Sequence, residues 1–346
     1  MLRRTLPALC LALLLWTLLL CVPASRAYAT DAVSGAPAVS GAPAVSGAPA
    51  TAQDGEVVAV DQASRRVLVL RGVGELTEYQ DVTRPPVVWS WAADRAPDLG
   101  DLDPEQSWRD PDEAKPRTLD GRRYLLTTAS GGLAAVVDTA TGAGRWAADL
   151  GRDANPHSIE LLPDGNVAVA ASTGGWVRLY AASQGSRATT HATFRLPGAH
   201  GVHWDERTGL LWVLGDDELA GLRVGGTPAA PTLTAVRSAP LPDRGGHDLA
   251  PVLGAPGRFW VSTLHGLWRY DPAADRFAAV RLADPADERD VKSLGDEPGT
   301  GRLLTVAPDH SSACGWCTSV IRLHRPEGAW KLTGTQLYKA RWWGDR

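Results

Sequence analysis

HSIELLPDGNVAVAASTGGWVRLY, residues 157–180, is the stretch that decides the fold. It reads as a short apolar strand, a tight turn at Asp164 and Gly165, a stronger apolar strand, a second turn and a third strand. The Asp-Gly pair supplies the positive φ angle that a hairpin turn needs. Similar phrases begin at Lys115, His200, His247 and Lys292. Their starts lie about 42 to 47 residues apart, which is the period of a β-propeller blade.

A sixth unit is split between the two ends of the chain. Residues 56–71, EVVAVDQASRRVLVLR, match the second and third strands of a blade, and residues 87–93, VVWSWAA, supply its outer strand. The missing inner strand is KARWWG, which begins at Lys339. Pairing this last segment with the first blade closes a ring and removes its exposed sheet edges. The sequence therefore predicts an all-β fold, a six-bladed β-propeller over residues 54–346, with the ring closed by the C-terminal strand.

The N-terminal region is predicted to lie outside the ring. Two arginines precede a leucine-rich stretch, and Ala27 and Ala29 form a small-x-small cleavage site, so residues 1–29 read as a secretory signal peptide. An uncleaved membrane anchor is the alternative. Residues 30–53 repeat the phrase VSGAPA and have too little apolar surface to order themselves, which predicts a disordered spacer. We therefore expect a secreted, extracellular domain with no membrane contact after cleavage.

Charge and cysteine content narrow the range of partners. The formal net charge is -4 at pH 7, and it becomes more negative when the arginine-containing signal peptide is removed, so nucleic acid is not expected as a partner. Outside the predicted signal peptide, the cysteines are Cys314 and Cys317. In an oxidising compartment such a close pair is typically a structural disulfide, with a redox pair or a metal site as alternatives. The protein is expected to be a monomer.

Amines and imidazoles recur at the first position of the repeat. The chain has only four lysines, and three of them share this position with three histidines. The series is Lys115, His157, His200, His247, Lys292 and Lys339. Because the strands of a blade alternate in direction, all six side chains are expected at one mouth of the central channel, where ligand sites of closed rings commonly lie. The turns between second and third strands bring Ser130, Asp216 and His265 to the same face.

This set predicts a pocket for an anionic small molecule or glycan. The lysines would bind the anion, since each supplies a compact charge, and the three turn residues would add ligand contacts. The candidate catalytic residues are His157, His200 and His247. These histidines would act as general bases or would hold a divalent metal, with Mn²⁺ and Zn²⁺ as candidates; no motif requires a cofactor. The alternative is that each residue only hydrogen-bonds a carbonyl at the start of an inner strand.

Two phrases of the repeat resemble a known group of proteins. LLPDGNVAVAAS followed by VRLY resembles the inner hairpin of secreted bacterial six-bladed propellers of the gluconolactonase and NHL-repeat type. The whole ring resembles an uncharacterised group of secreted actinobacterial propellers. Gluconolactonase-like members bind their metal through acidic and amide side chains, whereas histidine and lysine are expected at this mouth, so lactonase activity is not carried over.

A closer chemical parallel is with the propeller lyases that cleave uronate polysaccharides by β-elimination, some with a three-histidine metal site. By that resemblance, the histidines would supply the metal site or the base, and the lysines would neutralise the uronate carboxylate. Those lyases typically have seven blades and six are counted here, so the likeness is one of fold and chemistry. Two functions stay open: a carbon-oxygen lyase acting on an acidic polysaccharide, and a non-catalytic extracellular ligand-binding or scaffold propeller.

Overall fold

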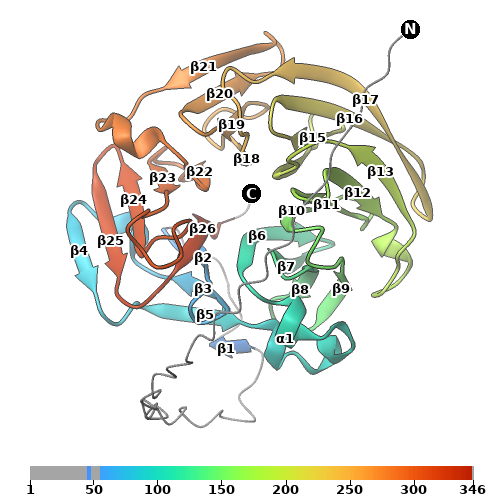
Figure 1. Ribbon diagram of the computed structural model, residues 1–346, viewed down its shortest axis with the longest axis horizontal. Helices are drawn as coiled ribbons and strands as arrows, with labels where there is room; N and C mark the ends of the chain where they lie inside the picture. Colours follow the sequence, from blue (N-terminus) through green and yellow to red (C-terminus); the bar gives the residue numbers. More distant parts are fainter. Residues whose placement is uncertain (1–44, 48–54, 345–346) are drawn as a thin grey trace, which may run out of the picture. The chain divides into compact units, whose positions relative to one another are not determined.

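The computed structural model describes residues 45–47 and 55–344. Six β-sheets stand around a common axis (Figure 1), which confirms the predicted all-β, six-bladed β-propeller. The predicted signal peptide and most of the predicted spacer lie outside the described residues. The exception is β1 (Val45–Gly47), which pairs with β5 (Val87–Trp91) at the edge of the first blade. Three residues of the predicted spacer therefore form a strand.

Four blades are built from four consecutive strands each. Blade 2 contains β6 (Pro111–Leu119), β7 (Arg122–Ala129), β8 (Leu133–Asp138) and β9 (Gly144–Asp149). Blade 3 contains β10 (Pro156–Leu161), β11 (Val167–Ala171), β12 (Trp176–Tyr180) and β13 (His191–Arg195). Blade 4 contains β14 (Gly201–Asp205), β15 (Leu210–Leu214), β16 (Glu218–Thr227) and β17 (Ala230–Pro240). Blade 5 contains β18 (Asp248–Pro251), β19 (Phe259–Ser262), β20 (Leu267–Asp271) and β21 (Arg276–Val280).

The first and last blades share strands from both ends of the chain. Blade 1 contains β2 (Val57–Asp61), β3 (Arg66–Leu70) and β5, and its inner strand is the C-terminal β26 (Leu337–Trp342), which pairs antiparallel with β2 as predicted. Blade 6 contains β22 (Ser293–Asp296), β23 (Leu303–Val306), β24 (Val320–His324) and β25 (Gly328–Leu332). Its outer edge carries β4 (Tyr79–Val82), which pairs in parallel with β25. The ring is thus closed twice, and the sequence predicted only the closure by β26.

Short helices occupy connections between strands. The segment from β5 to β6 contains η2 (Ala93–Arg95), η3 (Pro97–Leu102) and α1 (Pro104–Ser107). Single turns also occur at η1 (Val73–Glu75), η4 (Ala182–Gln184) and η5 (Pro285–Glu288). Across the described part of the chain, no helix has the length and apolar character needed to span a membrane.

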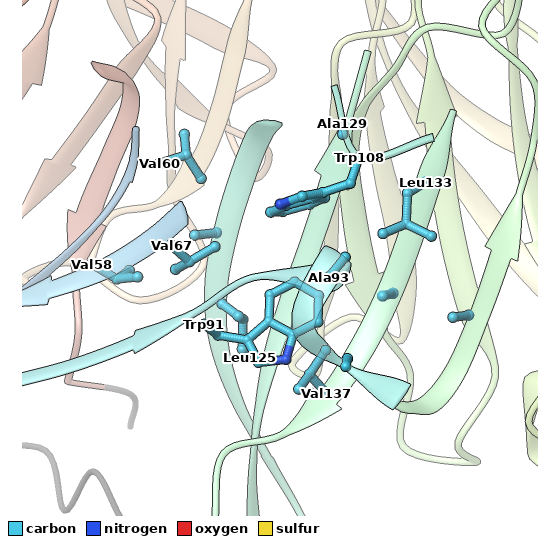
Figure 2. Close-up of a cluster of buried hydrophobic side chains, with 14 of the residues drawn as sticks. Val58, Val60, Val67, Trp91, Ala93, Trp108, Leu125, Ala129, Leu133 and Val137 are labelled. Atoms are coloured by element: carbon cyan, nitrogen blue, oxygen red, sulfur yellow. The ribbon is translucent and has the colours of Figure 1, made fainter. Parts of the chain in front are cut away.

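The core lies between neighbouring blades, where apolar side chains of facing strands pack together. Figure 2 shows one such cluster, in which Val58 and Val67 of blade 1 lie near Leu125 of blade 2. All three are fully buried. Trp108, which follows α1, meets Trp91 edge to face with ring centroids 5.2 Å apart, an arrangement that aromatic rings favour. This packing anchors the connection that leads into β6, the inner strand where the site begins.

Cys314 and Cys317 form a disulfide in the turn between β23 and β24. Their Cα atoms lie 5.9 Å apart. The predicted cysteine pair is therefore confirmed as a disulfide within the last blade.

Candidate functional site

The six inner strands each bring one side chain to the same end of the channel. We call this set the mouth ring; its members are Asp112, His157, His200, His247, Lys292 and Tyr338. Asp112, His157 and Tyr338 lie near the starts of β6, β10 and β26, and the other three directly precede β14, β18 and β22. Four members were predicted from the sequence. Lys115 and Lys339 are not members: Asp112 and Tyr338 stand where these two lysines were expected.

Four aromatic rings form most of the mouth ring. His157 stacks on His200 with ring centroids 4.6 Å apart, and His247 stands edge-on to His200 at 4.5 Å. Tyr338 stacks on His157 at 5.7 Å and lies 6.2 Å from His247. His200 and His247 are half-buried, whereas His157 and Tyr338 are buried. The histidines predicted to share one mouth therefore do share it.

Asp112 links this cluster to a turn residue. Its Oδ2 lies 3.6 Å from Nδ1 of His157 and accepts a hydrogen bond of 3.0 Å from Oγ of Ser130. Burial raises the pKa of Asp112 well above its ordinary value, so this carboxyl group favours its neutral form. Ser130, predicted at the mouth, thus lies beside the ring and positions Asp112.

The three imidazoles are neutral at neutral pH. Burial lowers the pKa of His200 to about 4. Burial, with added repulsion from His200, holds the pKa values of His157 and His247 well below the ordinary histidine value. Nδ1 of His157 and Nδ1 of His247 are buried and have no hydrogen-bond partner among the described residues. An unpaired buried polar atom is costly, so a hydrogen bond to either nitrogen would stabilise the mouth ring.

Lys292 is the cation of the mouth ring. Its Nζ lies 2.6 Å from Nε2 of His247 and 6.0 Å from the ring centroid of Tyr338. Burial lowers its pKa to about 8, although Asp290 acts in the opposite direction. Within the described residues, no carboxylate oxygen lies within the 4.0 Å that defines an ion pair with this ammonium group. Lys292 is therefore a half-buried cation without an anionic partner.

Deeper in the channel lies a cluster of paired charges, which we call the buried ion cluster. Its members are Glu113, Lys115, Asp248, Lys339 and Arg341. Arg341 bridges the two acids, with Nε 2.6 Å from Oε1 of Glu113 and Nη2 2.6 Å from Oδ1 of Asp248. Lys339 Nζ lies 3.4 Å from Glu113 and 3.7 Å from Asp248. Burial opposes the ionisation of Glu113, but the charges of Arg341, Lys339 and Lys115 outweigh it and hold its pKa well below the ordinary value.

Lys115 and Lys339 are bonded within the channel wall. Lys115 Nζ donates to the carbonyl of Val202 at 2.8 Å and to Oγ of Ser158 at 2.9 Å. Lys339 Nζ donates to the carbonyl of His157 at 3.2 Å. The alternative prediction was that each residue of the series only hydrogen-bonds a carbonyl of an inner strand. Lys115 and Lys339 make such bonds, which stabilise the channel wall.

Lys115 was predicted at the mouth because its phrase was aligned with the phrase that begins at His157, but β6 begins at Pro111, four residues before Lys115. The pairing of β6 with β7 shifts between Pro111 and Glu113, and that of β10 with β11 shifts between Pro156 and Ser158. The two strands share this shift, so Asp112, and not Lys115, occupies the position in blade 2 that His157 occupies in blade 3. A signal for this was present, since each of these residues directly follows a proline. In the last inner strand the prediction was wrong by one residue: Tyr338, which precedes Lys339, belongs to the mouth ring.

Among the described residues, the other two predicted turn residues make their polar contacts with neighbouring turns and not with the mouth-ring side chains. The backbone carbonyl of Asp216 accepts hydrogen bonds from the amides of Gly245 and Gly246. His265 is exposed and pairs with Asp243, with Nδ1 3.3 Å from the carboxylate. Neither has a contact with the mouth ring in the described part of the chain.

The histidines do not fit a metal site as they stand. The rings of His157 and His200 are nearly parallel and stacked, with 12° between their planes, which is not the arrangement of two nitrogens directed at one metal ion. Among the described residues, no group of three or more His, Cys, Asp or Glu side chains is placed to hold a metal ion. We therefore derive no chemical step through Mn²⁺ or Zn²⁺.

Comparison with solved structures gives distant likenesses. Virginiamycin B lyase from Staphylococcus aureus is 11% identical, with 67% of this chain and 69% of that chain covered and a TM-score of 0.42. A protein of unknown function from Bacteroides caccae is 11% identical over 82% of this chain and 94% of that chain, with a TM-score of 0.47. The dihydro-heme d1 dehydrogenase NirN is 16% identical over 85% of this chain and 55% of that chain, with a TM-score of 0.44. None of these likenesses assigns an activity.

No curated protein matches the sequence. A family described as a family of unknown function (DUF6528) matches residues 40–346, and the chain belongs to this family.

Proposed function

We propose that the mouth ring binds a small anionic ligand, an acidic sugar or another carboxylate, in a secreted propeller. The observation that carries this proposal is the unpaired ammonium group of Lys292. The cations of the buried ion cluster each contact Glu113 or Asp248, whereas the side-chain hydrogen-bond partner of Lys292 among the described residues is a neutral imidazole. A bound carboxylate would supply the missing partner and offset the cost of holding this cation half-buried.

The neutral imidazoles suit the rest of such a ligand. A neutral imidazole presents one N–H donor and one acceptor nitrogen, which matches the hydroxyl groups of a sugar. His200 and His247 are half-buried and thus accessible from the mouth. The secreted location is part of the proposal and fits the disulfide between Cys314 and Cys317, because disulfides persist in oxidising compartments.

The binding proposal is tested by nuclear magnetic resonance of the histidine ring C–H groups during titration with galacturonate. We expect the signals of His200 and His247 to shift. His191, which is exposed on the outer strand β13, is the internal control and should not move. If galacturonate, acetate and sulfate all leave the mouth-ring signals unchanged, or if His191 shifts as much as they do, the proposal fails.

A second candidate function is β-elimination from a uronate glycan. It is favoured by the 2.6 Å contact between Lys292 and His247 beside Tyr338. Lys292 would turn from Nε2 of His247 to the uronate carboxylate, and the nitrogen of His247 freed in this way would remove the proton at C5. That electron pair would form the C4–C5 double bond as the C4–O bond breaks. Burial raises the pKa of Tyr338 well above its ordinary value, so its phenol keeps the proton that it would donate to the leaving oxygen.

Elimination creates an unsaturated uronate, which absorbs ultraviolet light where the substrate does not. We expect absorbance to rise when the protein is incubated with a suitable uronate polysaccharide, and to rise far more slowly with the His247→Ala variant. The panel is run with and without Mn²⁺ and Zn²⁺. No rise under any condition would exclude the lyase and leave a non-catalytic binding or scaffold propeller.

A further inference from the structure

Two connected hollows lie away from the mouth ring. A cavity of about 310 Å³ lies at the far ends of the inner strands, and its lining includes Asp205, Pro251, Asp296 and Trp342, the last residues of β14, β18, β22 and β26. A groove of about 990 Å³ lies over blades 4 and 5. Arg207, Pro256 and Gly257 line both hollows, so the groove leads into the cavity.

The groove is lined by arginines. Arg207, Arg223 and Arg237 are exposed. In the described part of the chain, none of these three guanidinium groups has a carboxylate within ion-pair distance, whereas Arg258 pairs with Asp271 at 3.0 Å. A guanidinium group presents a planar fork that matches a carboxylate or a sulfate in bidentate fashion. Three guanidinium groups without an ion-pair partner among the described residues therefore line one groove, which favours a ligand with several anionic groups.

The cavity has a different chemistry. Trp204, Phe259 and Trp342 supply aromatic walls, and the buried indole N–H of Trp204 has no hydrogen-bond partner among the described residues. Asp205, Glu206 and Asp296 also line the cavity, and so do Lys115, Arg117 and Arg341, whose charges are paired with Glu113, Glu160 and Asp248. Carboxylates repel anions but accept hydrogen bonds from hydroxyl groups, and the apolar faces of sugars pack on aromatic rings. The cavity therefore suits the apolar face and the hydroxyl-bearing edge of one sugar ring, with the carboxylate of that ring directed out toward the groove, and its volume is that of a small-molecule site.

We propose that the groove and cavity together form a second binding site for an acidic oligosaccharide, with its anionic groups on the arginines and one sugar ring in the cavity. A molecule must carry both hydroxyl-bearing rings and anionic groups to match the cavity and the groove together. This site uses none of the mouth-ring residues. Its test is therefore independent of the proposed anion site at the mouth.

The test is calorimetric titration of the full chain with tetragalacturonate and with a neutral galactose tetrasaccharide of the same length. Replacing Arg223 and Arg237 together, as Arg223→Gln and Arg237→Gln, should weaken tetragalacturonate binding at least about tenfold, the scale of one lost charge-assisted hydrogen bond. Leu253→Trp, which fills the cavity from its half-buried wall, should also weaken binding. Arg195→Gln, at an exposed arginine of β13, is the control and should leave this binding unchanged. All variants are also compared in the Lys292→Met background, which removes the proposed binding at the mouth ring.

Circular dichroism and the melting temperature establish that each variant is folded. The proposal is overturned if tetragalacturonate does not bind, if the neutral tetrasaccharide binds equally well, or if the arginine variants bind like the native protein. It is also overturned if a glutamate peptide or a single-stranded oligonucleotide of similar charge binds as tightly, because the groove would then be a general polyanion surface.

Discussion

Lys115 and Lys292 are both shielded from solvent, but their ammonium groups have different partners. Burial lowers the pKa of each to about 8. Lys115 also lies 3.7 Å from Glu113 and donates two hydrogen bonds to the channel wall. In the described part of the chain, the ammonium group of Lys292 has a neutral imidazole as its hydrogen-bond partner and no carboxylate at ion-pair distance. The first amine is fully bonded within the protein, and the second remains able to bind a ligand.

Glu113 holds the buried ion cluster together. It contacts Arg341, Lys339 and Lys115, so the Glu113→Gln variant would leave buried cations with too few anionic partners. We expect this variant to lower the free energy of unfolding by about 3 to 5 kcal/mol, the scale of a broken buried ion pair. Chemical denaturation at pH 7 measures it.

The control for that prediction is Glu78→Gln, at an exposed glutamate, which should change stability by less than about 0.5 kcal/mol. The folded pKa of Glu113 lies below its unfolded value, so its ionisation stabilises the fold above about pH 4 and this contribution is lost as the pH falls further. The difference between the native protein and Glu113→Gln should therefore shrink in acid. Equal stability of the two proteins at pH 7 would show that the cluster does not stabilise the fold.

At the scale of strands, closure of the ring depends on β26. This strand supplies the inner edge of blade 1, and it also brings Tyr338 to the mouth ring and Lys339 and Arg341 to the buried ion cluster. We expect the backbone amides of β26 to be as strongly protected from hydrogen exchange as those of β10, an inner strand formed within one blade. Exchange of β26 amides that is orders of magnitude faster would mean that the ring opens at this seam.

Strands and closure were predictable because each blade repeats its apolar runs and its turn residues, such as Asp164 and Gly165. The register at the channel was less predictable, since the start of an inner strand decides which side chain stands at the mouth. β6 begins at Pro111, so Asp112 stands at the mouth and Lys115 lies deeper in the channel. The parallel pairing of β4 with β25 was missed because Tyr79–Val82 is mostly exposed and polar, so its sequence gives little indication of a strand.

At the scale of the whole molecule, the two ends of the channel differ in chemistry. One end carries neutral imidazoles around Lys292, and the other opens into an aromatic cavity joined to an arginine-lined groove. Between them lies the buried ion cluster, whose charges are paired within the wall. The two proposed sites for anionic ligands therefore lie apart from each other, in a molecule whose formal net charge is -4.

The most direct test of the mouth ring compares galacturonate binding by Lys292→Met and Lys331→Met. Lys331 is a matched control, because this lysine lies in β25 and pairs with Asp81 at 3.6 Å. The groups that act on Lys292 are His247, Asp290, Lys339 and Tyr338. The ammonium form binds the anion, so affinity should be constant below pH 7 and should fall about tenfold per unit above its pKa of about 8.

Calorimetry from pH 6 to pH 10 measures this dependence. We predict that Lys331→Met binds like the native protein, with the same loss of affinity at high pH, and that Lys292→Met binds at least about tenfold more weakly at pH 7. If Lys292→Met binds galacturonate as tightly as the native protein, the mouth ring is not the anion site and the account is contradicted.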